Sequence, residues 1–307
     1  MASPLSPPPR SRAACEPPPA TVRRAVRRAL EEDLGPLGDL TSVLVPPEAV
    51  AAAAFISRGQ GVVAGVACAE AACRSVDPAL EVSWSRRDGD VVRPGDEIGL
   101  VAGRLSSIVT AERTALNFLC HLSGVASATR RYVDAAKAAN PMTRVLDTRK
   151  TTPGLRALEK AAVRAGGGTN HRGSLSDAVL VKDNHLGATS ITRAVRDALE
   201  RWPGRMVEVE CDRIEQVAEA LDAGATVVLC DNMSPGEVAA AVRLVEGHPR
   251  GRAGAVLVEA SGGITLETIG EFAAAGAHLV SIGALTHSAP ILDIGLDLLS
   301  KEASGDE

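Results

Sequence analysis

The sequence contains few aromatic residues and no long apolar segment. Two Trp, one Tyr and three Phe occur among 307 residues, so a core must be built from Ala, Val, Leu and Ile. Hydrophobic residues still make up 45%, which is enough to bury one large domain or two modest ones. No apolar run reaches the roughly 18 residues of a membrane-spanning helix, and no hydrophobic signal segment opens the chain. We therefore expect a cytoplasmic protein without a membrane partner.

Paired cysteines and a strong charge of one sign are also absent. The six cysteines show neither C-x-x-C spacing nor a compact framework, which favours reduced thiols. The net charge of −5 argues against a general nucleic-acid-binding protein. Lysine is scarce, because only five of the 33 basic residues are Lys, yet three of these five fall between residues 150 and 182. Since lysine supplies a compact point charge that arginine does not, this stretch is either functional or a chance grouping.

The first 140 residues change character along the chain. Residues 1–20 contain seven prolines and no periodic pattern, which predicts a disordered tail. Residues 21–34 place apolar residues on one face, which predicts a helix with Thr21 as its N-cap. Short apolar runs broken by Gly, Pro and Asp predict β-hairpins between residues 50 and 110. A helix is expected over residues 104–139.

From about residue 140 onward, short apolar runs alternate with Ala-rich segments of helical length. The six predicted strands are Thr143–Asp147, Ala178–Lys182, Met206–Glu210, Thr226–Asp231, Ala255–Glu259 and His278–Ile282. Nearly continuous apolar strands with helical crossovers predict a parallel sheet that is covered on both faces. An eight-stranded barrel usually needs about 250 residues, so six units in about 145 residues predict a smaller α/β barrel. An open, doubly wound sheet is the alternative.

Charged or polar residues follow the carboxyl end of every predicted strand, the edge at which barrel enzymes place their active sites. Five cations lie on the segments around this edge: Arg149, Lys150, His171, Arg172 and Lys182. The planar fork of arginine matches a carboxylate or a phosphate, and lysine adds a point charge. Cations gathered in one place repel one another unless they face a polyanion, so the set predicts an anionic ligand. Pairing of each cation with a neighbouring acid is the alternative.

Two carboxylates, Glu210 and Asp231, end the third and fourth predicted strands. Carboxylates that project into a cationic pocket predict a hard divalent ion, and Mg²⁺ is the natural choice beside phosphates. The alternative is that they serve as counter-charges for Lys182.

A short glycine segment, Ser261-Gly262-Gly263, precedes a predicted helix at 265–275. The free N–H groups and the dipole of a helix N-terminus favour phosphate binding. Gly283 follows the last predicted strand, and His287 lies just beyond it, within reach of a phosphate. These residues predict a phosphate site like the one usual at late strands of barrels.

Taken together, these residues show that the chain resembles the quinolinate phosphoribosyltransferases (nicotinate-nucleotide pyrophosphorylase, carboxylating). The most specific motifs are DTRKTTPGLR at 147–156, GGGTNHR at 166–172 and VKDNHL at 181–186. Shorter matching segments extend over nearly everything except the tail: 29–42, 112–117, 209–210, 230–232, 261–264 and 281–290.

The resemblance implies a fold of two domains. An N-terminal α/β sandwich would occupy residues 21–128, joined by the C-terminal segment 288–307. An incomplete parallel α/β barrel of six or seven strands would occupy residues 129–287. A last helix, over residues 291–299, would return to the sandwich.

The resemblance also implies a reaction, in which phosphoribosyl pyrophosphate and quinolinate give nicotinate mononucleotide, carbon dioxide and pyrophosphate for NAD synthesis. The implied catalytic residues are Lys150, Lys182, Glu210 and Asp231, of which Glu210 and Asp231 serve Mg²⁺ and the ribose hydroxyls. The quinolinate carboxylates would be held by Arg149, His171, Arg172, Lys182 and, in a homodimer, the partner's Arg113. The phosphate groups would be held by Lys150, Asn232, Ser261, Gly262, Gly263, Gly283 and His287.

Other functions remain open at this point. A relative with the same fold could take another substrate, as in molybdenum-transport-associated homologues or nicotinate phosphoribosyltransferases. The full Arg149, Arg172 and Lys182 set favours quinolinate over nicotinate, because nicotinate has only one carboxylate. A Schiff-base aldolase with Lys182 as nucleophile, or a non-catalytic anion-binding regulator, are alternatives from other classes. A biotinyl or lipoyl carrier is excluded, because no lysine occurs between residues 1 and 136.

Overall fold

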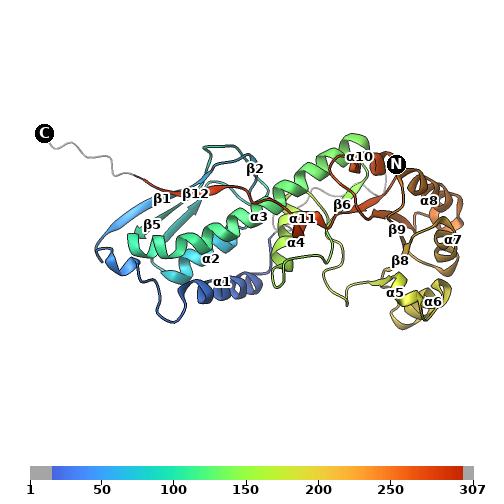
Figure 1. The fold of residues 1–307 in the computed structure, drawn as a ribbon, viewed down its shortest axis with the longest axis horizontal. Coiled ribbons are helices and arrows are strands. Elements are labelled where there is room, and N and C mark those ends of the chain that lie inside the picture. Colours follow the sequence, from blue (N-terminus) through green and yellow to red (C-terminus); the bar gives the residue numbers. More distant parts are fainter. Residues whose placement is uncertain (1–15, 300–307) are drawn as a thin grey trace. The chain divides into compact units, whose positions relative to one another are not determined.

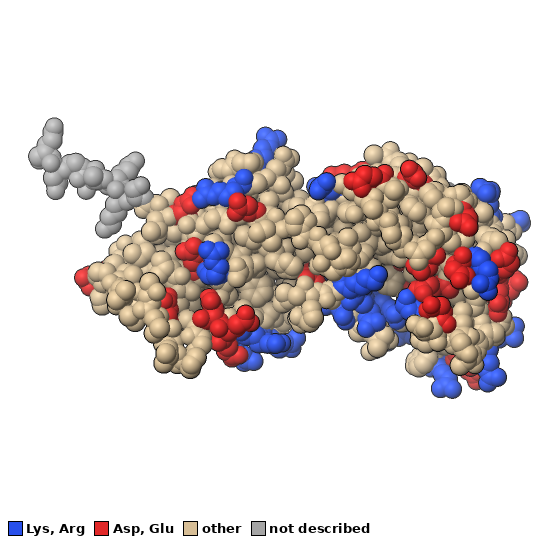
Figure 2. All heavy atoms as spheres, viewed as in Figure 1, with Lys and Arg blue, Asp and Glu red and all other residues tan. Residues whose placement is uncertain are grey.

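The computed structural model describes residues 16–299, so most of the predicted tail lies outside the described residues. The described chain forms two compact units. The N-terminal unit comprises residues 16–128, 152–167 and 288–299, and the barrel unit comprises residues 129–151 and 168–287. Figure 2 shows that the visible face carries both basic and acidic side chains. None of the helices in the described part combines the length and apolar character needed to cross a bilayer.

The N-terminal unit contains a four-stranded antiparallel sheet (Figure 1). In spatial order its strands are β12 (Ile294–Leu298), β1 (Val50–Ser57), β5 (Glu97–Arg104) and β3 (Glu81–Trp84). A separate pair is formed by β2 (Gly61–Val62) and β4 (Val91–Val92). The helices of this unit are α1 (Pro19–Leu34), the 3-10 helix η2 (Ser42–Leu44), α2 (Val66–Val76), the first part of α3 (Leu105–Ala139) and α4 (Arg156–Ala165).

Apolar residues at helical spacing explain why α1 packs on this unit. Val22, Val26 and Leu30 lie four residues apart and are buried, which places one apolar stripe against α2. In the sheet, Phe55 is fully buried and stacks on Trp84, with 5.1 Å between the ring centroids. These contacts use two of the six aromatic residues in the chain.

Three sequence predictions for this unit are wrong in detail. The first helix begins at Pro19 rather than after Thr21, because proline is well suited to the first turn, and no side chain caps it. Residues 66–76, expected within a run of hairpins, form the helix α2. Its first N–H is bonded by the side chain of Asp88, 3.1 Å away and distant in sequence, so no local signal marked this start. The C-terminal segment does return to this unit, but as the strand β12 and not as a helix.

The barrel unit contains a six-stranded parallel sheet, as the alternating pattern predicted. Its strands are β6 (Arg144–Leu146), β7 (Val179–Val181), β8 (Val207–Cys211), β9 (Val227–Asp231), β10 (Leu257–Ser261) and β11 (Leu279–Ser281). Its helices are the last part of α3, α5 (Asp183–Leu186), α6 (Ile191–Arg201), α7 (Ile214–Ala223), α8 (Pro235–Gly247), α9 (Pro249–Arg252), α10 (Ile269–Ala274) and α11 (Ala284–His287). In Figure 1, α6, α7 and α8 lie along the outer side of β8 and β9.

The strand order shows that this sheet is an incomplete barrel. The order is β6-β11-β10-β9-β8-β7, and every neighbouring pair is parallel. The two edge strands are consecutive in the chain, so one further pairing, β6 with β7, would close the ring. Among the described strands these two are not paired, and residues 147–178 connect them.

The connection between β6 and β7 differs from the others, because its helix groups with the N-terminal unit. Residues 152–167, which include α4, belong to that unit and not to the unbroken barrel segment 129–287 of the prediction. A buried carboxylate fixes this position: Glu159 accepts from the Thr152 backbone N–H at 3.0 Å and lies 2.9 Å from Nε2 of His121.

Gly124 of α3 gives a direct test of how the C-terminal segment packs. A Cβ atom at Gly124 would lie 2.2 Å from the carbonyl oxygen of Pro290, which approaches the helix at this point. Gly124→Ala is therefore expected to lower the free energy of unfolding by about 1–3 kcal/mol despite the better helix propensity of Ala. The same substitution at Gly247, near the end of α8 with open space around it, is expected to be neutral or stabilising. Equal stability of the two variants in denaturant titrations would show that this packing is wrong.

Candidate active site

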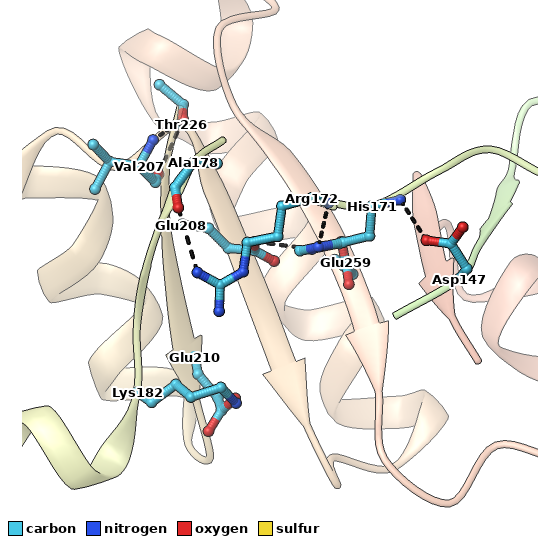
Figure 3. A network of polar contacts seen from close by, with 10 residues as sticks. All are labelled: Asp147, His171, Arg172, Ala178, Lys182, Val207, Glu208, Glu210, Thr226 and Glu259. Carbon is cyan, nitrogen blue, oxygen red and sulfur yellow. Dashed lines mark hydrogen bonds and ion pairs between the residues drawn. The ribbon is translucent and has the colours of Figure 1, made fainter. Parts of the chain in front are cut away.

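The parallel strands bring their carboxyl ends to one edge of the sheet, and the predicted site residues of the barrel unit follow these ends. Glu208 and Glu210 lie two residues apart on β8, so they share one face of the strand. Figure 3 shows Lys182, Arg172 and His171 on that same side, with Glu259 of β10. The sheet thus collects cations and carboxylates in one place.

Lys182 and Glu210 form an ion pair across the ends of β7 and β8 (Figure 3). The Lys182 side chain is 41% exposed and that of Glu210 is 13% exposed. The backbone N–H of Lys182 donates to Nδ1 of His185 at 2.9 Å, which fixes the start of α5. The counter-charge role that the sequence left open for Glu210 is therefore present in the structure.

Arg149 and Arg172 lie close enough to repel each other. Burial and the charge of Arg149 lower the pKa of Arg172, while Glu208, Asp177 and Glu210 oppose this shift. Nη1 of Arg172 donates to the carbonyl oxygen of Ala178 at 3.3 Å, which anchors the side chain along β7. A guanidinium pair held this way favours a ligand with two negative groups.

The segment 166–172 is pinned to the barrel by Asp147, which follows β6 and is fully buried. Its Oδ1 accepts from the backbone N–H of His171 at 2.9 Å, and its Oδ2 accepts from the amide of Asn170. A buried carboxylate at the end of one strand therefore sets the position of the Arg172 backbone.

His171 and two glutamates form a buried cluster below these cations. Nε2 of His171 lies 3.0 Å from Oε2 of Glu208 and 3.7 Å from Oε2 of Glu259. Both glutamates are buried, with 0% and 1% of their surface exposed. Burial and the neighbouring charge of Glu208 raise the pKa of Glu259 to about 8, while His171 and a hydrogen bond from Ser281 act in the opposite direction.

The turn at Ser261–Gly263 lies against Asn232. Asn232 has a φ of 55°, the one positive value at a non-glycine residue in the described chain, and its N–H donates to the Ser261 carbonyl at 2.9 Å. Gly262 has a φ of 94°, and a Cβ there would lie 2.2 Å from Oδ1 of Asn232. Only glycine fits this approach, and such a backbone cradle suits a phosphate.

Lys150, Gly283 and His287 also come together. A Cβ on Gly283 would lie 3.1 Å from Nε2 of His287 and 3.2 Å from Cδ of Lys150. The hydroxyl of Thr286 donates to the Lys150 carbonyl at 2.7 Å, which ties α11 to the segment after β6. A lysine, a histidine and an open glycine backbone form a second group suited to an anion.

Two models of one protein family match this chain. "Quinolinate phosphoribosyl transferase, N-terminal domain" matches residues 39–123, and "Quinolinate phosphoribosyl transferase, C-terminal domain" matches residues 125–297. The chain belongs to the quinolinate phosphoribosyltransferase family. A nicotinate-nucleotide pyrophosphorylase [carboxylating] of Mycobacterium leprae is 40% identical over 284 residues, covering 90% of this chain and 97% of the relative.

Further comparisons agree with this family. A probable nicotinate-nucleotide pyrophosphorylase [carboxylating] of Archaeoglobus fulgidus is 40% identical over 265 residues, covering 86% of this chain and 99% of the relative. The solved structure of the nicotinate-nucleotide pyrophosphorylase from Francisella tularensis superposes with a TM-score of 0.85 at 35% identity. That comparison covers 92% of this chain and 98% of the other, so the two-unit fold is shared throughout.

Most of the residues predicted for this quinolinate phosphoribosyltransferase family site lie in the barrel unit, whereas Arg113 lies in the N-terminal unit. The side chain of Arg113 is 66% exposed on α3. No role was predicted from the sequence for Asp147, Glu208 or Glu259. A signal for Glu208 was present, because it is a charged residue at an inward position within the apolar run VEVEC.

Glu259→Gln is expected to flatten the pH dependence of stability. Because the pKa of Glu259 rises from 4.5 to about 8, the folded protein binds a proton between these pH values that the unfolded chain has lost. Its contribution therefore makes the free energy of unfolding fall as pH rises through this window. Urea titrations at several pH values should show a smaller fall in Glu259→Gln than in wild type. Glu219→Gln, a half-buried glutamate bonded to Thr192, is the control and should keep the wild-type slope.

Proposed function

We propose that this protein transfers the phosphoribosyl group of phosphoribosyl pyrophosphate to quinolinate and releases carbon dioxide, pyrophosphate and nicotinate mononucleotide for NAD synthesis. The observation that carries this proposal is that Arg172 and Lys182 lie on one side of the sheet (Figure 3), with the charge of Arg149 acting on Arg172, in a chain that belongs to this family. The predicted cytoplasmic location stays a prediction.

The acceptor is the dicarboxylate quinolinate because the cations outnumber what one carboxylate can neutralise. Arg149, Arg172 and Lys182 would hold its two carboxylates, with His171 and the partner's Arg113 completing the clamp. Nicotinate, which has one carboxylate, would engage only part of this set. Binding of a carboxylate to Lys182 would also release Glu210 from its ion pair.

The donor's phosphate groups would bind the two glycine-containing groups. Backbone N–H groups near Ser261, Gly262 and Gly263 form one part with Asn232, and Lys150, Gly283 and His287 form the other. The left-handed backbone at Gly262 and Asn232 supports this assignment, because strain at such positions is characteristic of ligand sites.

The carboxylates Glu210 and Asp231 would hold Mg²⁺ together with the ribose hydroxyls. They fit the ion, because both offer hard oxygen donors at the ends of neighbouring strands, and Mg²⁺ typically takes one or two carboxylates plus substrate oxygens. When bound, the ion neutralises charge that develops on the leaving pyrophosphate.

The chain's own residues contribute orientation and electrostatics. The cations of the clamp hold quinolinate so that its ring nitrogen faces C1 of the ribose, where a nitrogen–carbon bond forms as the bond to pyrophosphate breaks. Lys150 and His287 stabilise the charge on the departing group. The quaternised ring then accepts the electron pair of the adjacent carbon–carboxylate bond, carbon dioxide leaves, and that ring carbon takes up a proton. Lys182 is the residue whose loss we expect to affect acceptor binding most.

We also propose a homodimer in which Arg113 enters the partner's site. Arg113 is exposed, and its neighbours on α3 line a hollow of about 480 Å³ within the N-terminal unit. The rest of the hollow is lined by α1 and by residues 153–155. A concave, charged surface beside an exposed arginine suits contact with a second copy.

The acceptor is tested by measuring carbon dioxide and pyrophosphate release with quinolinate or nicotinate. Equal amounts of both products are expected only with quinolinate, phosphoribosyl pyrophosphate and Mg²⁺. Loss of a hydrogen bond to a charged group removes about 1.5–3 kcal/mol, so kcat/KM for nicotinate should be lower by at least about tenfold. Equal turnover of nicotinate, or no release from quinolinate by a folded protein, would contradict the proposal.

The shared site is tested by mixing two inactive variants. Arg113→Ala and Lys182→Ala should each lose most activity. Arg113→Ala removes the arginine that enters the partner's site, and Lys182→Ala removes a cation of the acceptor clamp. In a mixed dimer one site carries both changes and the other carries neither. Co-expression should therefore restore up to about a quarter of wild-type activity. Recovery no greater than the sum of the separate variants would rule out the exchange of Arg113.

A further inference from the structure

The two buried glutamates beside His171, Glu208 and Glu259, have no role in the reaction as described so far. Glu208 comes from β8 and Glu259 from β10, on either side of β9, and both face the ring of His171 (Figure 3). Among the described residues, no well-aligned hydrogen bond reaches either oxygen of Glu208 or Oε1 of Glu259. Burying carboxylate oxygens in this way is costly, so something must compensate them.

A metal ion is the first candidate, because one atom from each of the three residues lies within 4.8 Å of the others. The hydrogen bond on the other side of the ring argues against it. Nδ1 of His171 accepts from the backbone N–H of Arg172 at 2.9 Å. An imidazole that accepts at Nδ1 carries its proton on Nε2, so the nitrogen that faces the carboxylates has no lone pair for a metal.

The same hydrogen bond gives the cluster a direction. Nε2 of His171 faces two carboxylates, with Oε2 of Glu208 at 3.0 Å and Oε2 of Glu259 at 3.7 Å. The opposite edge of the ring holds the N–H of Arg172. The imidazole is therefore a rigid connection from two strands to the backbone of an arginine in the acceptor clamp.

The electrostatics indicate which acid is the charged one. Glu208 is among the groups whose charge supports the cationic form of Arg172, whereas Glu259 is not among them. Burial and the neighbouring charge of Glu208 raise the pKa of Glu259, which favours its protonated form. The charge of Glu208 acts on Arg172 and favours its cationic form.

We propose that Glu208 and Glu259 are positioning residues, which fix His171 as its Nε2–H tautomer and through its ring hold Arg172 in place for the acceptor's carboxylate. This inference rests on the proposed function for the identity of the acceptor, but not for the state of His171. Both ring nitrogens of His171 contact protein groups, so these contacts fix the position of the ring in the clamp.

Two conservative variants separate the roles of the acids. Glu208→Gln keeps the shape but removes the charge that faces Arg172, so KM for quinolinate should rise about tenfold or more, as for other residues that orient binding groups. KM for phosphoribosyl pyrophosphate should change less than about twofold. Glu259→Gln imitates the protonated acid and serves as the comparison for Glu259→Leu, which removes the second polar group facing His171 and should raise KM for quinolinate more than Glu259→Gln does. Glu219→Gln is the matched control on α7, outside the clamp, and should change neither.

A spectroscopic measurement tests the same claim without turnover. Nitrogen-15 NMR of histidine-labelled, ligand-free protein, with His171 assigned from a His171→Gln variant, should show a neutral Nε2–H imidazole. Glu208→Gln should shift this resonance toward a tautomer mixture. If wild-type protein fails to turn over quinolinate, the proposed function fails while this spectrum still decides the positioning claim.

Each contrary result has a definite meaning. An imidazolium or an Nδ1–H tautomer at His171 overturns the proposal. Equal changes in both KM values for Glu208→Gln, or no change in either, overturn it as well. Elemental analysis that finds one tightly bound metal per chain in wild type, lost in Glu208→Gln, would replace it with a metal site.

Discussion

The structure of the site depends on holding like charges together at one edge of a parallel sheet. Arg149 and Arg172 repel each other, and in a partly buried setting that repulsion is less screened than in water. The fold offsets it in part with the charges of Glu208, Asp177 and Glu210, and the buried Asp147 holds the backbone next to Arg172. An anionic ligand would offset the rest, which suits a dianion.

The incomplete barrel supplies this arrangement. Because β6 and β7 are not paired, the long connection between them has room at this edge of the sheet. Residues 169–172 of this connection run beside the strand ends, where Thr169 pairs with Leu146. Asp147 binds the backbone of that connection at His171, and Glu208 contacts the His171 ring. The opening of the barrel and the placement of Arg172 are therefore one structural feature. The same connection contributes α4 to the N-terminal unit, where the buried Glu159 fixes it.

The sequence predicted the barrel well and the N-terminal unit less well. All six parallel strands were predicted, because buried parallel strands are continuous apolar runs that carry their own signal. The start of α2 depends on Asp88, and β12 forms because β1 offers an unpaired edge, and neither fact is visible in a local window. The prolines at residues 17–19 made the first two residues of α1, Pro19 and Ala20, look like part of the tail.

For the site, charge and motifs predicted the individual residues, whereas only the structure shows which of these residues pair with one another. Lys182 and Glu210 were named separately, and only the strand register shows that they meet. Glu208 and Glu259 were passed over because a sequence does not show which inward-facing residues of strands separated by β9 approach one ring. The prediction from sequence thus named the cations and carboxylates at the strand ends and missed Glu208 and Glu259, which lie against the His171 ring.

The most direct test of this account is a crystal structure of the protein with quinolinate bound. The account predicts one carboxylate against the Arg149 and Arg172 guanidinium groups, the other against Lys182, and Lys182 separated from Glu210. His171 should remain between Glu208 and the Arg172 backbone. Quinolinate bound away from these cations, or bound there with the Lys182–Glu210 pair intact, would contradict the central claim that this cation set is the acceptor clamp.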